Sequence, residues 1–272
     1  MKRLLAIIPI LFFFLISCEK ELDFKYHYVE PQLVIEGVLS TEGIKVSLTT
    51  TTPMDEKIEE DYLTDAEVYL ADLTEAQEYE LHPDINGIFK NNCIPVIGNE
   101  YQLRVLRNGN EYTSTCRMRP ATKILNLMFQ WIKMPYDHVA VLQITFADLE
   151  SYEDYYWIKI LRNGAPYKWI MSDDRSAANG VITEAIMTTR MDLSEEDEKD
   201  ILRDGDEVTV AINTISREMY DYLVAIENNS NGPAMFEGDF CLGYFMASDY
   251  VSSSIIFRPD EITNYEFFME SD

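Results

Sequence analysis

Apolar and polar residues alternate along most of the first half of the chain, which is the pattern of half-buried β-strands. Short turn sequences rich in Gly, Asn, Asp and Pro separate the alternating stretches. Asn108-Gly109 is a strong hairpin signal, because both central positions of such a turn need positive φ. We therefore expect strands around Leu33–Leu39, Ile44–Leu48, Val68–Leu70, Tyr79–Leu81, Ile88–Cys93, Tyr101–Val105 and Glu111–Met118.

These stretches give about seven short strands in about ninety residues, with no helical pattern between them. That arrangement is typical of a small β-sandwich of immunoglobulin-like or transthyretin-like type. We expect residues 31–120 to form this N-terminal sandwich, with Pro120 closing it.

The second half, residues 121–272, also reads as mainly β, with one or two short helices. Strands are expected in Ile124–Ile132, in His138–Ala147 and in Tyr155–Arg162, and Asn163-Gly164 repeats the hairpin signal. One helix is expected after the N-cap Ser216, and a second between the N-cap Ser194 and Gly205. Apolar side chains recur at helical spacing after Ser216, namely Met219, Tyr222, Leu223 and Ile226.

Two segments, Tyr101–Tyr112 and Tyr156–Tyr167, share the pattern Y-x-L/I-R/K-V/I-L-R-N-G-x-x-Y. They are either duplicated binding sites or two similar hairpins, one in each half. The hairpin interpretation is favoured, because every shared residue has a structural role: the alternating apolar residues face a core and Asn-Gly makes the turn.

The N-terminus has the features of a secretory signal. Lys2 and Arg3 precede the apolar run Leu4–Ile16, which is too short to span a bilayer. Leu15, Ile16 and Ser17 before Cys18 resemble a bacterial lipobox. We therefore expect residues 1–17 to be a lipoprotein signal peptide, Cys18 to carry the acyl chains and residues 18–30 to be a tether. The alternative is an ordinary signal peptide followed by a chance cysteine.

Acidic residues follow the cysteine directly, at Glu19, Glu21 and Asp23. This tract resembles the surface-export signal of lipoproteins of the Bacteroidota, which predicts an outer-membrane protein that faces the cell exterior. The alternative is a charged, solvated tether.

The charge balance excludes some partners. The chain carries 48 acids and 22 bases, a net charge of −26, and removal of residues 1–17 would leave 20 bases and a net charge of −28. Nucleic acid is disfavoured, because its affinity comes largely from Lys and Arg on phosphates. Anionic lipid is disfavoured too, so the acyl chains on Cys18 must supply the attachment to the outer membrane.

Three cysteines remain beyond Cys18. Cys93 and Cys116 lie on strands that we expect to be neighbours, so a disulfide between them is a candidate in an oxidising compartment. The alternative is two small buried thiols, and Cys241 leaves an odd number in either case.

No established catalytic motif is present: the chain has no G-x-S-x-G, H-E-x-x-H, P-loop or G-x-G-x-x-G sequence. Acidic turns at Asp204–Glu207 and Ser172–Asp174 are more simply explained by solvent exposure than by metal binding. We expect no catalytic residues, no metal and no cofactor. A pair of carboxylates far apart in sequence remains the alternative for a hydrolase.

Aromatic residues give the only candidates for ligand binding, because aromatic faces bind sugars and peptides. They are Trp131, Tyr136, Tyr155 and Trp157. Alternation puts Tyr155, Trp157 and Lys159 on one face of a strand and Tyr156 on the other, so some of these side chains belong to the core.

The order of several motifs resembles a known family. "QLVIEGVLS", "DAEVYLAD", "GNEYQLRVLRNGNEYTS", "GDEVTVAINTISREMYDYLVAIENN" and "MFEGDFCLGYFMAS" follow the lipoprotein-like start. Together they resemble the Bacteroidota outer-membrane lipoprotein family with domain of unknown function 4249 (DUF4249). The resemblance implies an N-terminal β-sandwich, a second mainly β domain and pairing with a TonB-dependent transporter. It implies no catalytic residues.

The leading hypothesis is therefore a non-catalytic, surface-exposed outer-membrane lipoprotein that serves as the accessory or ligand-binding partner of a TonB-dependent nutrient transporter. The first alternative is a structural or adhesive envelope protein. The second is a hydrolase with dispersed carboxylates.

Overall fold

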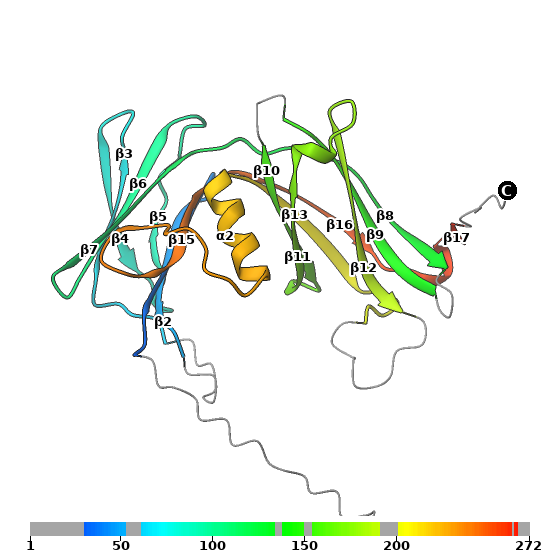
Figure 1. The fold of residues 1–272 in the computed structure, drawn as a ribbon, viewed down its shortest axis with the longest axis horizontal. Coiled ribbons are helices and arrows are strands. Elements are labelled where there is room, and N and C mark those ends of the chain that lie inside the picture. Colours follow the sequence, from blue (N-terminus) through cyan, green and yellow to red (C-terminus); the bar gives the residue numbers. More distant parts are fainter. Residues whose placement is uncertain are drawn as a thin grey trace, which may run out of the picture.

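The protein is built from two β modules that lie side by side, with one helix between them (Figure 1). The computed structural model describes residues 30–52, 61–133, 138–149, 154–190, 201–262 and 264–265. The expected mainly β fold is confirmed, and α2 is the one α-helix in these ranges.

The strands of the first half end close to where alternation predicts. They are β1 Leu33–Ser40, β2 Gly43–Thr50, β3 Glu67–Asp72, β4 Gln77–Pro83, β5 Phe89–Asn91, β6 Glu100–Arg107 and β7 Asn110–Arg117. The elements of the second half are β8 Ile124–Lys133, β9 His138–Ala147, β10 Tyr155–Arg162, β11 Ala165–Asp173, β12 Val181–Arg190, β13 Glu207–Ile215, α2 Arg217–Glu227, β14 Glu237–Gly238, β15 Leu242–Ala247, β16 Tyr250–Ile256 and β17 Asn264–Tyr265.

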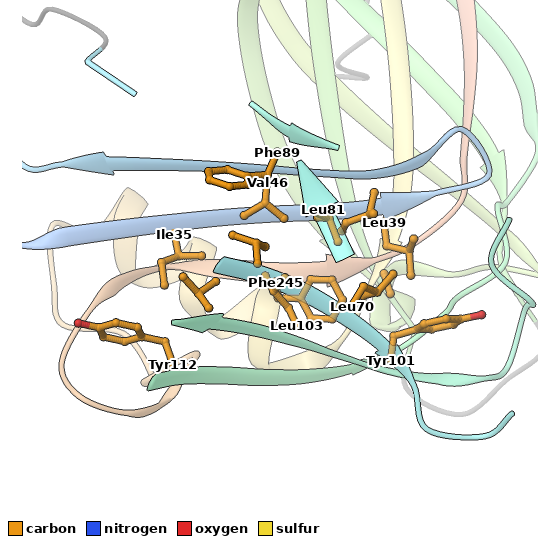
Figure 2. Packing of buried hydrophobic residues seen from close by; sticks show 14 of the residues in the cluster. Ile35, Leu39, Val46, Leu70, Leu81, Phe89, Tyr101, Leu103, Tyr112 and Phe245 are labelled. Atoms are coloured by element: carbon orange, nitrogen blue, oxygen red, sulfur yellow. The ribbon is translucent and has the colours of Figure 1, made fainter. Parts of the chain in front are cut away.

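The first module is a single folded sheet with the order β14-β7-β6-β3-β4-β5-β2-β1-β15, counted over the described strands. Side chains of β1 and β2 meet those of β3, β6 and β15 in one core (Figure 2). The alternation in β6 is representative, because Tyr101, Leu103 and Val105 are all buried there. Asn108 and Gly109 make the predicted β6–β7 turn with φ of 54° and 84°.

The expected boundary at residue 120 needs a correction, because the chain returns to the first module near its C-terminal end. β15 runs parallel to β1, with Ile35 opposite Gly243 and Gly37 opposite Phe245. Phe245 is 2% exposed and belongs to the first core. Residues 237–247 therefore complete the N-terminal sandwich, although the sequence assigns them to the C-terminal domain.

The returning segment contacts both edges of the first sheet, and a glycine makes each contact. Gly243 has φ of 105°, and a Cβ there would lie 1.9 Å from the Ile35 carbonyl oxygen of β1. Gly238, in β14, has φ of 102°, and a Cβ would lie 2.0 Å from the Glu111 carbonyl oxygen of β7. Only glycine fits at either place, because the neighbouring backbone occupies the space of a side chain.

The linker after β7 joins the same segment. The Arg119 N–H donates to the Ala247 carbonyl at 3.1 Å, and the Asp249 N–H donates to the Arg119 carbonyl at 3.0 Å. The first sheet is thus bridged at the end of β7, where the chain crosses to the second module.

The second module is a sandwich of two sheets, with the described strands in the orders β11-β10-β13-β16 and β12-β9-β8-β17. Its core holds side chains of β8 and β9 against those of β10 and β13, including Phe146, Tyr156, Ile158 and Val210. The Phe146 and Tyr156 rings meet edge to face at 4.9 Å.

Helix α2 begins where the sequence predicts. The Ser216 side chain accepts a hydrogen bond from the Met219 N–H at 3.2 Å, which satisfies one free donor of the first turn. Met219 and Leu223 are buried on one face and pack with Ile215 and Met246. Most of the other predicted helix, from Ser194 to Gly205, lies outside the described residues, and its described part, residues 201–205, is not helical.

The second Asn-Gly hairpin is held by a buried carboxylate. Asn163 and Gly164 have φ of 50° and 81°. The Asp206 carboxylate accepts hydrogen bonds from the Asn163 side chain and the Arg203 N–H, each at 2.7 Å, and pairs with Arg162 at 2.7 Å. Although burial alone would raise the pKa of Asp206, these three partners lower it below its ordinary value.

No helix in the part of the chain that the structure describes is both long and apolar enough to cross a membrane.

Gly243→Ala should destabilise the protein by about 3 kcal/mol or more, because its Cβ would overlap the Ile35 carbonyl and break the β1–β15 ladder. Gly164→Ala is the matched control. Gly164 also has positive φ, but nothing lies within 4 Å of the position that an added Cβ would take, so its cost should be limited to about 1–2 kcal/mol. Urea unfolding measures both, and equal losses would contradict the contact at β1.

Asp206→Asn should lower stability by about 3 kcal/mol at neutral pH, because Arg162 would lose its buried partner. The pKa of the Asp206 carboxyl is lower in the folded state than in the unfolded chain, where it is about 3.9. The ionised carboxylate therefore stabilises the fold above about pH 3.9, and this contribution is lost as the pH falls through the folded-state pKa. The difference from wild type should therefore shrink below about pH 4. Asp204→Asn is the control: its partner Arg258 is half-exposed, so its effect should stay within about 1 kcal/mol.

Candidate ligand-binding site

The four aromatic residues that the sequence suggests for ligand binding separate in the structure. Tyr136 lies outside the described residues, as does the lipidation candidate Cys18. Trp131 is buried in the second core, and its indole N–H donates to the Pro259 carbonyl at 3.3 Å. Trp131 is therefore a core residue, and its burial removes it from the candidate site.

Tyr155 and Trp157 are half-buried in an aromatic cluster between the two modules. The centroid of the Trp157 ring lies 6.4 Å from that of Trp169 in β11 and 6.0 Å from that of Tyr244 in β15, and both contacts are edge to face. Tyr155 meets Tyr220 of α2 at 4.8 Å. We call Tyr155, Trp157, Trp169, Tyr220, Tyr222 and Tyr244 the aromatic cluster.

Lys159 lies on the same face of β10 and covers Trp157. Its Nζ is 4.4 Å from the ring centroid, which is the distance of a cation–π contact. Burial lowers the pKa of Lys159 to about 8. No ion pair or hydrogen bond of this amine is found within the described residues, although the chain is strongly acidic.

The aromatic cluster combines two properties that suit ligand binding. Trp169 is 36% exposed, so an apolar face is available at the edge of the cluster. Lys159 supplies a cation that lacks an acidic neighbour in the described chain. The Trp157 Nε1–H is also buried without a hydrogen-bond partner in the described residues. An apolar face next to an unneutralised cation fits a ligand that has a flat apolar side and a negative charge.

The cluster also has a structural role, because it connects the two modules. Tyr244 belongs to the returning strand β15 of the first sheet, whereas Trp157 and Trp169 belong to the second module. Tyr222 of α2 meets Tyr244 at 6.0 Å. The position of each ring therefore depends on the packing of both modules and the helix.

A cavity of about 390 Å³ lies near the start of α2, at the edge of β7. β14 pairs only with Tyr112 and Thr113, so it covers only the beginning of that edge. The cavity wall is partly apolar and partly charged, with Cys116, Arg117, Arg119, Glu218, Phe236 and Phe245 among its residues. It has room for a small ligand that carries both apolar and charged groups.

Two side chains of the cavity wall, those of Cys116 and Arg119, interact with their surroundings in the fold. Burial raises the pKa of the Cys116 thiol, which keeps it protonated near neutral pH. The Arg119 Nη1 is 3.8 Å from the carboxylate of Asp154, which is 1% exposed. Arg119 thus connects the cavity to the residue that precedes β10 in the second module.

The candidate disulfide between Cys93 and Cys116 does not form in this structure, where both thiols are free. Cys93 follows β5, and Cys116 lies in β7. The strands β4, β3 and β6 separate these two in the sheet, so the expectation that they are neighbours is wrong. Cys93 is buried in the first core, as the alternative interpretation requires.

The acidic turns of the second module have structural partners. Asp206 holds the Asn163 hairpin, and the Asp173 side chain accepts a hydrogen bond from the Arg175 N–H at 3.0 Å. Among the residues that the structure describes, no group of three or more His, Cys, Asp or Glu side chains is placed to hold a metal ion.

Sequence reasoning missed Trp169, Tyr220, Tyr222 and Tyr244 as members of the site. Alternation in β11 would have placed Trp169 on the same face as Met171, but nothing in the sequence shows that this face meets β15 and α2. The neighbourhood of Trp157 depends on contacts across more than eighty residues, which a local pattern cannot report.

Comparisons with known proteins show the family and include a weak structural likeness. No curated protein matches the chain. Among solved structures, it is similar to a segment of two fibronectin type III domains from chicken tenascin. The identity is 10%, the match covers 84% of this chain and 100% of that chain, and the TM-score is 0.24, so the fold assignment rests on the strand pairings themselves. The family model described as "Domain of unknown function (DUF4249)" matches residues 19–254. The chain therefore belongs to the DUF4249 family.

Proposed function

We propose that the protein is a non-catalytic lipoprotein of the outer membrane that faces the cell exterior and assists a TonB-dependent nutrient transporter, to which it contributes a ligand-binding surface. One observation carries the proposal: the family match begins at residue 19, directly after Cys18 and its lipobox-like sequence. The shared part of the family thus starts where a lipoprotein would be cut and acylated.

The acyl chains would hold the protein at the membrane without a spanning segment. Each buried CH₂ contributes about 0.8 kcal/mol, and two or three chains on one cysteine give stable attachment. The tether from Cys18 leads to β1, which begins at Leu33. Fully extended, these residues reach about 50 Å, so both modules can stand clear of the lipid surface.

The aromatic cluster and the adjacent cavity support a binding role for the part that stands in water. Met235 lines the cavity and also packs with the helix residues beneath the cluster, so the two features share a wall. Trp169 and Lys159 offer the accessible face and the cation of the cluster. A sugar or peptide nutrient with a negative charge fits this surface best.

The anchor is tested by Cys18→Ser in cells fed radiolabelled palmitate. Wild-type protein should carry the label and sediment with outer membranes, whereas the variant should be unlabelled and lost from the membrane fraction. Cys241→Ser is the matched control and should behave as wild type, because Cys241 is half-buried within the fold. An unlabelled wild-type protein would end the proposal.

The transporter partner is tested by affinity purification from gently solubilised outer membranes. We expect a TonB-dependent transporter to co-purify with the wild-type protein in near-stoichiometric amount. An unrelated lipoprotein of the same membrane with the same tag should not recover it. Recovery of the protein alone, under conditions that preserve other membrane complexes, would instead favour a structural or adhesive role.

A further inference from the structure

We propose that Leu73, Ile94, Val96 and Ile97 form a docking surface for a protein partner whose contact face is apolar and rimmed by Lys and Arg. We call these four residues the apolar loop surface. Their side chains are 46%, 80%, 54% and 54% exposed, respectively. Exposed apolar groups that gather in one place mark interaction sites more often than isolated ones do.

The loop that presents these residues is held firmly. Cys93 and Pro95 are buried between the exposed side chains. The Val96 N–H donates to the Tyr101 hydroxyl at 2.8 Å, and the Gly98 N–H donates to the Met118 carbonyl at 2.8 Å. The apolar side chains are therefore displayed on an ordered backbone, which reduces the entropy cost of binding.

Leu73 is joined to the same end of the sheet. Its N–H donates to the Glu100 carbonyl at 2.9 Å. The neighbouring Asp72 carboxylate accepts a hydrogen bond from the Asn99 side chain at 2.9 Å, and Asn99 ends the loop. The β3–β4 turn and the loop of residues 92–99 are thus locked together beside the start of β6.

The apolar loop surface lies at the end of the first module opposite the entry of the tether. β1 begins at Leu33, at the lower end of the module in Figure 1, and ends in the hairpin at Ser40–Gly43. The loop starts at that hairpin, because Ile44 pairs with Asn91. Eight residues of β1, about 25 Å, separate the two ends. With the anchor attached at the lower end, the surface lies on the side of the module away from the tether, which favours contact with a protein over contact with lipid; this step rests on the proposed function.

Charge also selects the partner. Exposed Glu42, Glu75 and Glu100 lie at this end of the module. Lys45 is paired with Glu42 at 3.3 Å and the exposed Arg117 lies opposite Glu100, so acids outnumber bases there. This acidic rim repels a second copy of the same surface and anionic lipid headgroups alike. It complements a protein that surrounds its apolar contact residues with bases.

The experiment places a photo-crosslinking amino acid at Ile94 or Val96 of the full-length protein in whole cells. Ile85 is the matched control, since it is 100% exposed but sits in the turn at the other end of β4 and β5. We expect one discrete adduct with a different protein from positions 94 and 96, and none from position 85. Adducts with lipid or with a second copy, equal adducts at Ile85, or no adduct at all would overturn the proposal.

The adduct partner is then identified by mass spectrometry, purified and titrated with the lipoprotein in detergent. Ile94→Ser combined with Val96→Ser should weaken its binding at least tenfold and leave the unfolding midpoint unchanged, because both side chains are exposed. Ile85→Ser should change neither, and added salt should weaken wild-type binding. If a transporter co-purifies with the wild type and the double variant retains full affinity, the docking surface is wrong and the proposed function stands.

Discussion

The fold depends on one long-range pairing, in which β15 lies parallel to β1 and adds the last strand to a sheet that the chain left about 120 residues earlier. The close approach is made possible by Gly243, whose position leaves no room for a Cβ against the Ile35 carbonyl. Phe245 then fills the first core beside Gly37, and Gly238 makes the matching contact on β7. The edges that β1 and the start of β7 would otherwise expose are thereby protected from pairing with other chains.

The same pairing organises the candidate binding surface. Because β15 is fixed on β1, Tyr244 is held against Trp157 of the second module, and α2 is packed over both through Met219 and Leu223. Lys159 rests on Trp157 and is desolvated there. A ligand surface that includes residues of both modules thus follows from the way the first sandwich is completed.

Sequence patterns predicted the local structure well, because its causes are local. Alternation identified the buried faces of β2, β3 and β6, each Asn-Gly pair made its hairpin, and Ser216 capped α2. The resemblance to the DUF4249 family was confirmed by the family match, whereas the assignment to outer-membrane lipoproteins of the Bacteroidota, the lipid anchor and the partner stay predictions. Patterns failed where the answer depends on which strands are neighbours, because alternation shows which side chains share a face but not which strand lies alongside. For this reason Cys93 and Cys116 were placed on adjacent strands, and Trp131 was given a binding role although it fills the second core. The return of residues 237–247 was missed for the same reason, because β15 pairs with β1, which lies about 200 residues earlier in the sequence.

The most direct test of this account is the unfolding of residues 31–120 as a separate chain, followed by far-ultraviolet circular dichroism in urea beside the full-length protein. Without β14 and β15 the fragment lacks Phe245 and leaves the β1 edge unpaired, so we expect it to show no cooperative transition. A cooperative transition with the steepness expected of a domain of about ninety residues would show that the first module folds without the returning segment, and would contradict the account.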